Sequence, residues 1–235
     1  MTVAIHQPNF LPWMGYFYKI SLCDNFVFFE TAQYTQPSFI RRVKIHKANN
    51  LNDEKYLIVQ LQKHSNFDAI DSLQVKANFE WQQKIKAQIH HAYHKAPYYH
   101  QLFPIVDQFF CTPLENLSFS NYAIEIIQFI SGLLNIHPKW EYASVLNIKS
   151  KAGDANIEMC HKVGGTHYLS GYGAKKYQTI DDYKKANLKF KYTNFLETFE
   201  TSDIPVHFKN KSIISYLAYY DIELLKEKFF QSKIN

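Results

Sequence analysis

VAIHQPNFLPWMGY, residues 3–16, decides the fold because a short apolar run passes directly into a loop stiffened by Pro8 and Pro12. We predict a buried strand over residues 3–5, and a helix over residues 13–22, where apolar and aromatic residues recur at helical spacing. Residues 26–29, Phe-Val-Phe-Phe, predict a second buried strand. Strand, loop, helix and strand in this order form a βαβ unit, so the two strands should be parallel.

Further patterns extend this unit. Residues 39–45 alternate and residues 56–61 are rich in β-formers, with turn residues 49–53 between them, which predicts a hairpin added to the first sheet. Apolar residues at helical spacing predict helices over 81–96 and 122–133, with Ser118 or Ser120 as the N-cap of the second.

The last third of the chain repeats the opening pattern. We predict a strand over 143–148, a helix over 154–163, a strand over 166–169 and a final amphipathic helix over 213–224. The predicted fold class is therefore α/β: a mainly parallel sheet with βαβ units at the N-terminus and around 143–170, plus a helical layer formed by 79–134. We expect residues 1–235 to form a single α/β domain with a helical insert at about 76–136.

Composition narrows the classes of function. The formal charge of +5 favours an anionic small-molecule partner, but the lysines and arginines are scattered, which argues against a nucleic-acid partner. Three cysteines without a Cys-x-x-Cys pair predict neither a disulfide framework nor a zinc knuckle. The chain opens without a leader pattern and contains no apolar run of membrane-spanning length, so we expect a cytoplasmic protein with no membrane span.

The opening loop holds the first candidate site residues. His6 follows the predicted strand directly, where open α/β sheets bind their ligands, and the two prolines would hold the neighbouring polar groups in place. Gly15 would let a ligand approach the N–H groups at the start of the helix. The candidates are His6 as a proton acceptor and Gln7, Asn9, Gly15 and Tyr16 as binding residues; the alternative is a stiffened connection with a hydrogen-bonded histidine.

The second group follows the second strand. Glu30 lies where a base or a ligand-orienting carboxylate would face His6, and Gln33 lies in the same segment. Arg42 and Lys44 alternate with apolar residues along the next strand, and their cationic side chains would point toward an anionic ligand. A solvated carboxylate and a strand with a wet face are the alternatives.

The third group is the turn SGYGAKKY at residues 170–177. Its alternating glycines would bring backbone N–H groups together around an anion, so Ser170, Gly171, Gly173 and Lys175 are candidate binding residues. Neither the Walker A spacing nor the dinucleotide fingerprint is present. His90 and His94 have the spacing of metal ligands but lack the glutamate of His-Glu-x-x-His, so no metal site is predicted.

These motifs together resemble the WbqC-like protein family across nearly the whole chain. The resemblance is carried by residues 6–13 with 15–17, by Asp24-x-Phe26-Val27, by 96–98, by 168–171 with 173–174 and Tyr177, and by 212–214. This chain departs from the family pattern at 30–34, Glu-Thr-Ala-Gln-Tyr in place of Asp-Asp-Val-Gln-Phe, and at Arg41-Arg42 in place of Asn-Arg.

The resemblance implies a place in bacterial surface-polysaccharide pathways that make modified amino sugars. We expect acyl or aminoacyl transfer to a nucleotide-linked amino sugar, with His6 or Glu30 accepting a proton and Ser170 stabilising an oxyanion. A nucleotidyltransferase-like activation of a carboxylate or phosphate, and a non-catalytic nucleotide-sugar-binding partner, are the alternatives. The cofactor is open between an activated acyl donor and ATP with Mg²⁺, and the oligomeric state is open as well.

Overall fold

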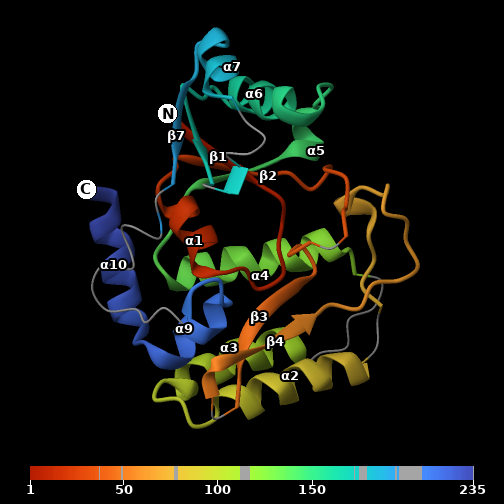
Figure 1. Ribbon diagram of the computed structural model, residues 1–235, viewed down its shortest axis with the longest axis vertical. Coiled ribbons are helices and arrows are strands. Elements are labelled where there is room, and N and C mark those ends of the chain that lie inside the picture. Colours follow the sequence, from red (N-terminus) through yellow and green to blue (C-terminus); the bar gives the residue numbers. More distant parts are fainter. Residues whose placement is uncertain are drawn as a thin grey trace.

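The computed structural model describes residues 1–36, 38–48, 50–76, 79–111, 117–171, 173–174, 179–193, 195 and 208–234, except for the side chains of 79 and 232–234. Its centre is a five-stranded sheet in which every neighbouring pair is parallel (Figure 1). The strands, in spatial order, are β5 (Lys139–Tyr142), β2 (Asn25–Phe28), β1 (Thr2–His6), β6 (His167–Ser170) and β7 (Lys189–Tyr192). The α/β class and the N-terminal βαβ unit are confirmed.

Alternate residues of the central strand enter two different cores. Ala4 packs in the core that contains helix α1 (Met14–Ser21), whereas Val3 and Ile5 pack in the core on the opposite face. That second core includes residues of α6 (Ala152–Lys162) and α7 (Ile180–Lys185). Because side chains of a strand point alternately to the two faces, the sheet lies between helices on both sides, as Figure 1 shows.

The predicted hairpin forms, but it is not part of the large sheet. Strands β3 (Arg42–Lys47) and β4 (Asn50–Ile58) pair antiparallel as a separate two-stranded sheet, so the expectation that they extend the first sheet was wrong. The apolar side chains of Val43, Ile45 and Leu57 are buried in the core shared with the helices. Hydrophobic burial thus holds the hairpin through one face. Its β3 strand also makes an isolated parallel bridge between Lys44 and Lys211, where the N–H of Ser212 donates to the carbonyl oxygen of Lys44 at 2.9 Å.

The predicted helical segment contains three helices: α2 (Phe79–Tyr93), α3 (Tyr99–Phe110) and α4 (Phe119–Leu133), preceded by the 3-10 turn η1 (Ile70–Ser72). Ser118 caps α4 by accepting a hydrogen bond from the backbone N–H of Asn121 at 3.5 Å, as predicted. In Figure 1, α4 lies beside the large sheet, whereas α2 and α3 lie at the far end of the molecule beneath the hairpin. Only α4 therefore fits the expected layer on the large sheet.

Two further boundaries differ from prediction. Residues 143–148 were expected to form a strand, but the strand is β5 just before them, and α5 (Ala143–Leu146) begins at Ala143. The predicted final helix is two helices, α9 (Ile213–Tyr219) and α10 (Ile222–Ile234), separated at Tyr220 by an extended backbone conformation. None of the described helices is long and apolar enough to cross a membrane.

Candidate functional site

The strand order places a candidate site at one end of the sheet. In chain order the five strands run third, second, first, fourth and fifth across the sheet, so the direction of winding reverses between β1 and β6. Open α/β sheets bind ligands outside the carboxyl ends of the strands at such a reversal. Those ends are His6 and Ser170, and both line a cavity of about 700 Å³.

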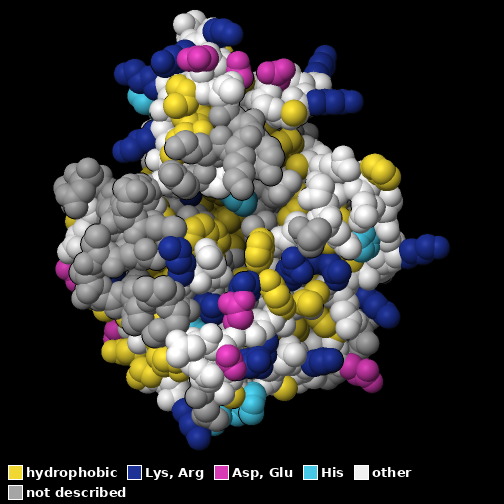
Figure 2. All heavy atoms as spheres, viewed as in Figure 1, with side chains coloured by type: hydrophobic (Ala, Val, Ile, Leu, Met, Phe, Trp, Pro, Cys, Tyr) yellow, Lys and Arg dark blue, Asp and Glu magenta, His cyan; other side chains and the backbone are white. Residues whose placement is uncertain are grey.

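The cavity has mainly aromatic and aliphatic walls with a few polar groups. Trp13, Phe29, Tyr168 and Phe195 are among the wall residues, and hydrophobic side chains gather in a hollow near the centre of the face drawn in Figure 2. A volume of this size, with apolar walls and convergent polar side chains, is typical of small-molecule sites.

The opening loop is held on both sides. The backbone N–H of Phe10 donates to the carbonyl oxygen of Ile40 at 2.7 Å, and the hydroxyl of Ser212 donates to the carbonyl oxygen of Leu11 at 2.7 Å. Leu11 has a φ of +43°, a left-handed conformation that is unfavourable for leucine. Strained residues persist where their surroundings fix them and are frequent at functional sites.

His6 presents one ring nitrogen as an acceptor. Its Nδ1 lies 3.0 Å from the carbonyl oxygen of Gln7, which can only accept, so Nδ1 carries the hydrogen and Nε2 carries the lone pair. The Tyr16 hydroxyl donates to the same carbonyl at 3.0 Å, and the Tyr16 ring meets the His6 ring edge-on, with centroids 4.6 Å apart. Burial, followed by the nearby charge of Lys19, lowers the pKa of His6 to about 3, so the imidazole is neutral at pH 7.

Lys19 is a site residue that the sequence analysis missed. It lies on α1, is only 4% exposed and lines the cavity, and its Nζ donates to the carbonyl oxygen of Ile5 at 2.7 Å. Burial lowers the pKa of its ammonium to about 7. A signal was present, because Lys19 is the only charged residue among residues 13–22.

Gly15 lines the cavity, but the space left by its missing side chain is used differently from what was expected. A Cβ atom at Gly15 would lie 2.3 Å from the indole ring of Trp13, so the glycine makes room for that ring. The expectation was that Gly15 would let a ligand reach the start of α1. Trp13 occupies the space beside Gly15 and meets Phe195 edge-on, with ring centroids 5.2 Å apart.

The serine-glycine turn meets the opening loop at the cavity, as predicted. Ser170, 1% exposed, lines it together with Gly171 and Gly173, whereas Lys175 lies outside the described residues. Polar side chains that were not predicted complete the walls: Asn156 from α6, Thr193 beyond β7, and Asn210 before α9.

Three predicted residues lie away from the cavity walls. Both carboxylate oxygens of Glu30, which is 4% exposed, accept backbone hydrogen bonds at the start of α5, from Ala143 at 3.2 Å and from Ser144 at 2.9 Å. Gln33 donates to the carbonyl oxygen of Asn66 at 2.9 Å. Asn9 is buried within the opening loop, and its Oδ1 has no hydrogen-bond partner in the described part of the chain.

The two cations of the hairpin are also directed elsewhere. Arg42 donates to the carbonyl oxygen of Ser38 at 3.1 Å and packs over the rings of Phe39 and Tyr56. Lys44 pairs with the carboxylate of Glu54 on the neighbouring strand. Neither Arg42 nor Lys44 lines the cavity, so the structure does not bring them together with His6.

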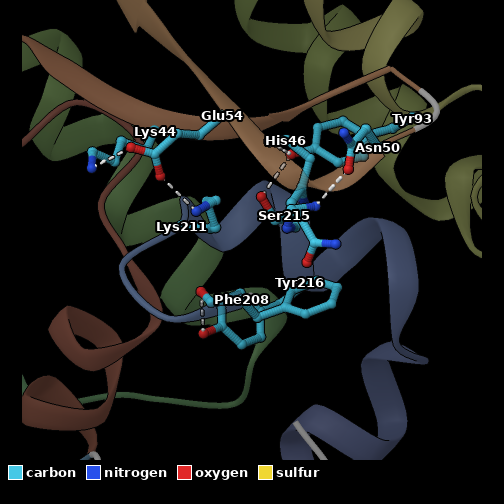
Figure 3. A network of polar contacts seen from close by, with 10 residues as sticks. Lys44, His46, Asn50, Glu54, Tyr93, Phe208, Lys211, Ser215 and Tyr216 are labelled. Atoms are coloured by element: carbon cyan, nitrogen blue, oxygen red, sulfur yellow. Dashed lines mark hydrogen bonds and ion pairs between the residues drawn. The ribbon is translucent and has the colours of Figure 1, made fainter. Parts of the chain in front are cut away.

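Glu54 connects the hairpin to Lys211, the residue that follows the wall residue Asn210, through the ion pairs drawn in Figure 3. Its carboxylate lies between Lys44 and Lys211, and the ammonium of Lys211, a residue that is 6% exposed, is 2.8 Å from it. The Tyr216 hydroxyl also donates to the carbonyl oxygen of Phe208 at 3.0 Å. Phe208 and Lys211, which make these contacts, lie on either side of the wall residue Asn210 in the sequence.

Metal-binding side chains do not cluster in the part of the chain that the structure describes: no group of three among His, Cys, Asp and Glu is arranged to hold an ion there. His90 Nδ1 is 2.9 Å from the Tyr99 hydroxyl, and His94 Nδ1 is 3.1 Å from the carbonyl oxygen of His90. The expectation that the residues of this chain, His90 and His94 included, form no metal site stays a prediction.

Fold and cavity together define an α/β protein with a cavity at the reversal point of a parallel sheet. The chain belongs to the WbqC-like protein family, whose model matches residues 7–226. It is also similar to the uncharacterized protein Rv1507c of Mycobacterium tuberculosis (strain ATCC 25618 / H37Rv), with 22% identity over 178 residues, 74% of this chain and 74% of that protein. No solved structure matches the chain.

Proposed function

We propose that this protein is a transferase that binds a nucleotide-linked amino sugar in the cavity and moves an acyl or aminoacyl group onto the sugar's amine. The observation that carries the proposal is the convergence of His6 and Ser170, at the carboxyl ends of the two central strands, on one cavity of about 700 Å³. The surface-polysaccharide pathway is the one that the family resemblance implies.

The transfer step needs a proton acceptor beside the attacking nitrogen. The amine nitrogen forms a bond to the acyl carbon, the bond from that carbon to the leaving group breaks, and the amine loses a proton. His6 Nε2 would take this proton and deliver it to the leaving group, because Nδ1 is held by Gln7 and the ring is neutral. The Ser170 hydroxyl and the N–H groups of the following turn would stabilise the oxyanion.

The strand order favours a second candidate, a nucleotidyltransferase-like enzyme that activates a carboxylate or phosphate. The first four strands, in the order third, second, first and fourth, follow the arrangement that binds nucleotides in doubly wound sheets. In this reaction the ligand would be ATP with Mg²⁺.

A thermal-shift screen against nucleoside triphosphates, nucleotide-sugars and acyl donors tests the proposal, since a ligand that binds only the folded state raises its stability. We expect stabilisation by nucleotide-sugars, and transfer in the presence of an acyl donor that is lost in His6→Gln while the fold is intact. Stabilisation by ATP alone would support the second candidate. Nucleotide-sugar binding without turnover would identify a non-catalytic binding partner.

A further inference from the structure

We propose that Lys19 forms an anion-binding subsite in the cavity and takes a phosphate or carboxylate group of the ligand as its counter-ion. The inference rests on the proposed function in one respect, that the cavity is the substrate site. It adds a recognition residue and the chemical class of the group recognised there.

Two buried lysines differ in whether a carboxylate balances their charge. Lys211, 6% exposed, has the Glu54 carboxylate at 2.8 Å, whereas Lys19, 4% exposed, forms no ion pair with any residue that the structure describes. An ammonium removed from water without a partner is strongly disfavoured, and buried charges in proteins are normally paired. Lys19 therefore lacks the compensation that the other buried lysine has.

Lys19 has more N–H donors than the described chain uses. An ammonium has three N–H donors, and within the described chain one of them is used, by the carbonyl oxygen of Ile5 at 2.7 Å. Because Lys19 lines the cavity, the other donors are available to a molecule bound there. Its pKa of about 7 means that the amine is readily protonated when an anion arrives.

The charged residues of the described cavity wall favour an anionic ligand. Among its described residues Lys19 is the single lysine or arginine, and there is neither aspartate nor glutamate. Ser170, Gly171 and Gly173 add a hydroxyl and a glycine-containing turn to the same cavity. A ligand with an anionic group thus meets one cation and no opposing carboxylate of the described wall.

A bound anion would also act on His6. The charge of Lys19 is one of the two causes that lower the pKa of His6. An anionic group that neutralises this charge raises the proton affinity of His6 Nε2, so binding of the anion would make the imidazole a better base for the proposed transfer.

The first experiment uses the unaltered protein and two small probes, pyrophosphate for phosphate and malonate for carboxylate. Reductive methylation with formaldehyde and cyanoborohydride at pH 7.5, read by peptide mapping, reports the accessibility of the Lys19 amine. We expect at least one probe to slow methylation of Lys19 and not that of Lys189, which is exposed at the amino end of β7, and the probe that protects identifies the anion. No protection by either probe would overturn the subsite.

Calorimetry on variants gives the second test. We expect Lys19→Met to bind the protecting probe roughly tenfold more weakly or worse, and Lys189→Met to bind it as the unaltered protein does. Equal affinity in Lys19→Met would overturn the subsite. If nucleotide-sugars still bind and react in Lys19→Met at unchanged affinity, the subsite is wrong and the proposed function stands. If they fail to bind the unaltered protein although a probe protects Lys19, the proposed function is wrong and the subsite stands.

Discussion

Lys19 donates to the carbonyl oxygen of Ile5 at 2.7 Å and has no carboxylate partner in the described chain, so the fold keeps a nearly uncompensated ammonium inside its cavity. Such an arrangement lowers stability and is retained where function needs it. The pKa of Lys19, about 7, has the same cause, because burial removes the water that would stabilise the charged form.

Replacement of Lys19 by methionine should therefore stabilise the protein without ligand. The apolar side chain has similar length and needs no counter-ion, and we expect the free energy of unfolding at pH 7 to rise by about 1–3 kcal/mol, after allowance for the lost hydrogen bond to Ile5. Urea denaturation measures this free energy of unfolding. Lys189→Met, at an exposed position, should change the stability by less than about 0.5 kcal/mol. A less stable Lys19→Met protein would contradict this account.

The stability of the unaltered protein should depend on pH through Lys19. The folded pKa of about 7 lies below the ordinary 10.5, so between these values the unfolded state holds the extra proton and the free energy of unfolding rises with pH. The contribution is at most about 1.4 kcal/mol per pH unit. Denaturation curves at pH 7, 8 and 9 should bring the unaltered protein closer to Lys19→Met as the pH rises; a constant difference would be evidence against a buried, titrating amine.

His6 should make the protein sensitive to acid. Its folded pKa of about 3 lies below the ordinary 6.5, so the unfolded state binds the extra proton between these values and stability is lost as the pH falls through that range. We expect His6→Gln to lose less stability than the unaltered protein between pH 6.5 and pH 4, measured by thermal denaturation. His94→Gln, at an exposed histidine, is the matched control and should follow the unaltered curve.

The sequence was sufficient to predict that His6 and Ser170 lie together. Both directly follow a predicted strand, and the carboxyl ends of parallel strands lie at one edge of the sheet. The sequence was not sufficient to predict the contacts of Glu30. Its carboxylate accepts N–H groups at the start of α5, and residues 143–148 were predicted to be a strand.

Other differences come from contacts between distant segments. The partner of Lys44 is Glu54, on a strand whose start lay inside a predicted turn. Helix α3 was not predicted, and it contains Pro104, a residue that normally argues against a helix interior. Lys19 was visible as a lone charge in an apolar helix, but its burial depends on strands and helices that pack around α1.

Glu54→Gln tests whether the ion pairs of the hairpin support the cavity. The change leaves the buried ammonium of Lys211 without a charged partner, and we expect a loss of about 1–3 kcal/mol in the free energy of unfolding, since Glu54 itself is partly exposed. Ligand affinity should also fall, because Lys211 adjoins the wall residue Asn210. Asp53→Asn is the matched control: Asp53 pairs with Lys47 at 3.7 Å with both side chains half exposed, and neither property should change.

Glu30→Gln separates a structural carboxylate from a catalytic one. In the structure both oxygens accept N–H groups at the start of α5, so the substitution replaces one strong acceptor by an amide N–H₂ group and should cost about 1–2 kcal/mol of stability. At a temperature where the variant is still folded, we expect ligand affinity and turnover to match those of the unaltered protein, because the side chain does not line the cavity. Glu223→Gln, at an exposed carboxylate, controls for the loss of one charge. Turnover that disappears in Glu30→Gln while ligand affinity and the fold persist would instead assign this carboxylate to the reaction.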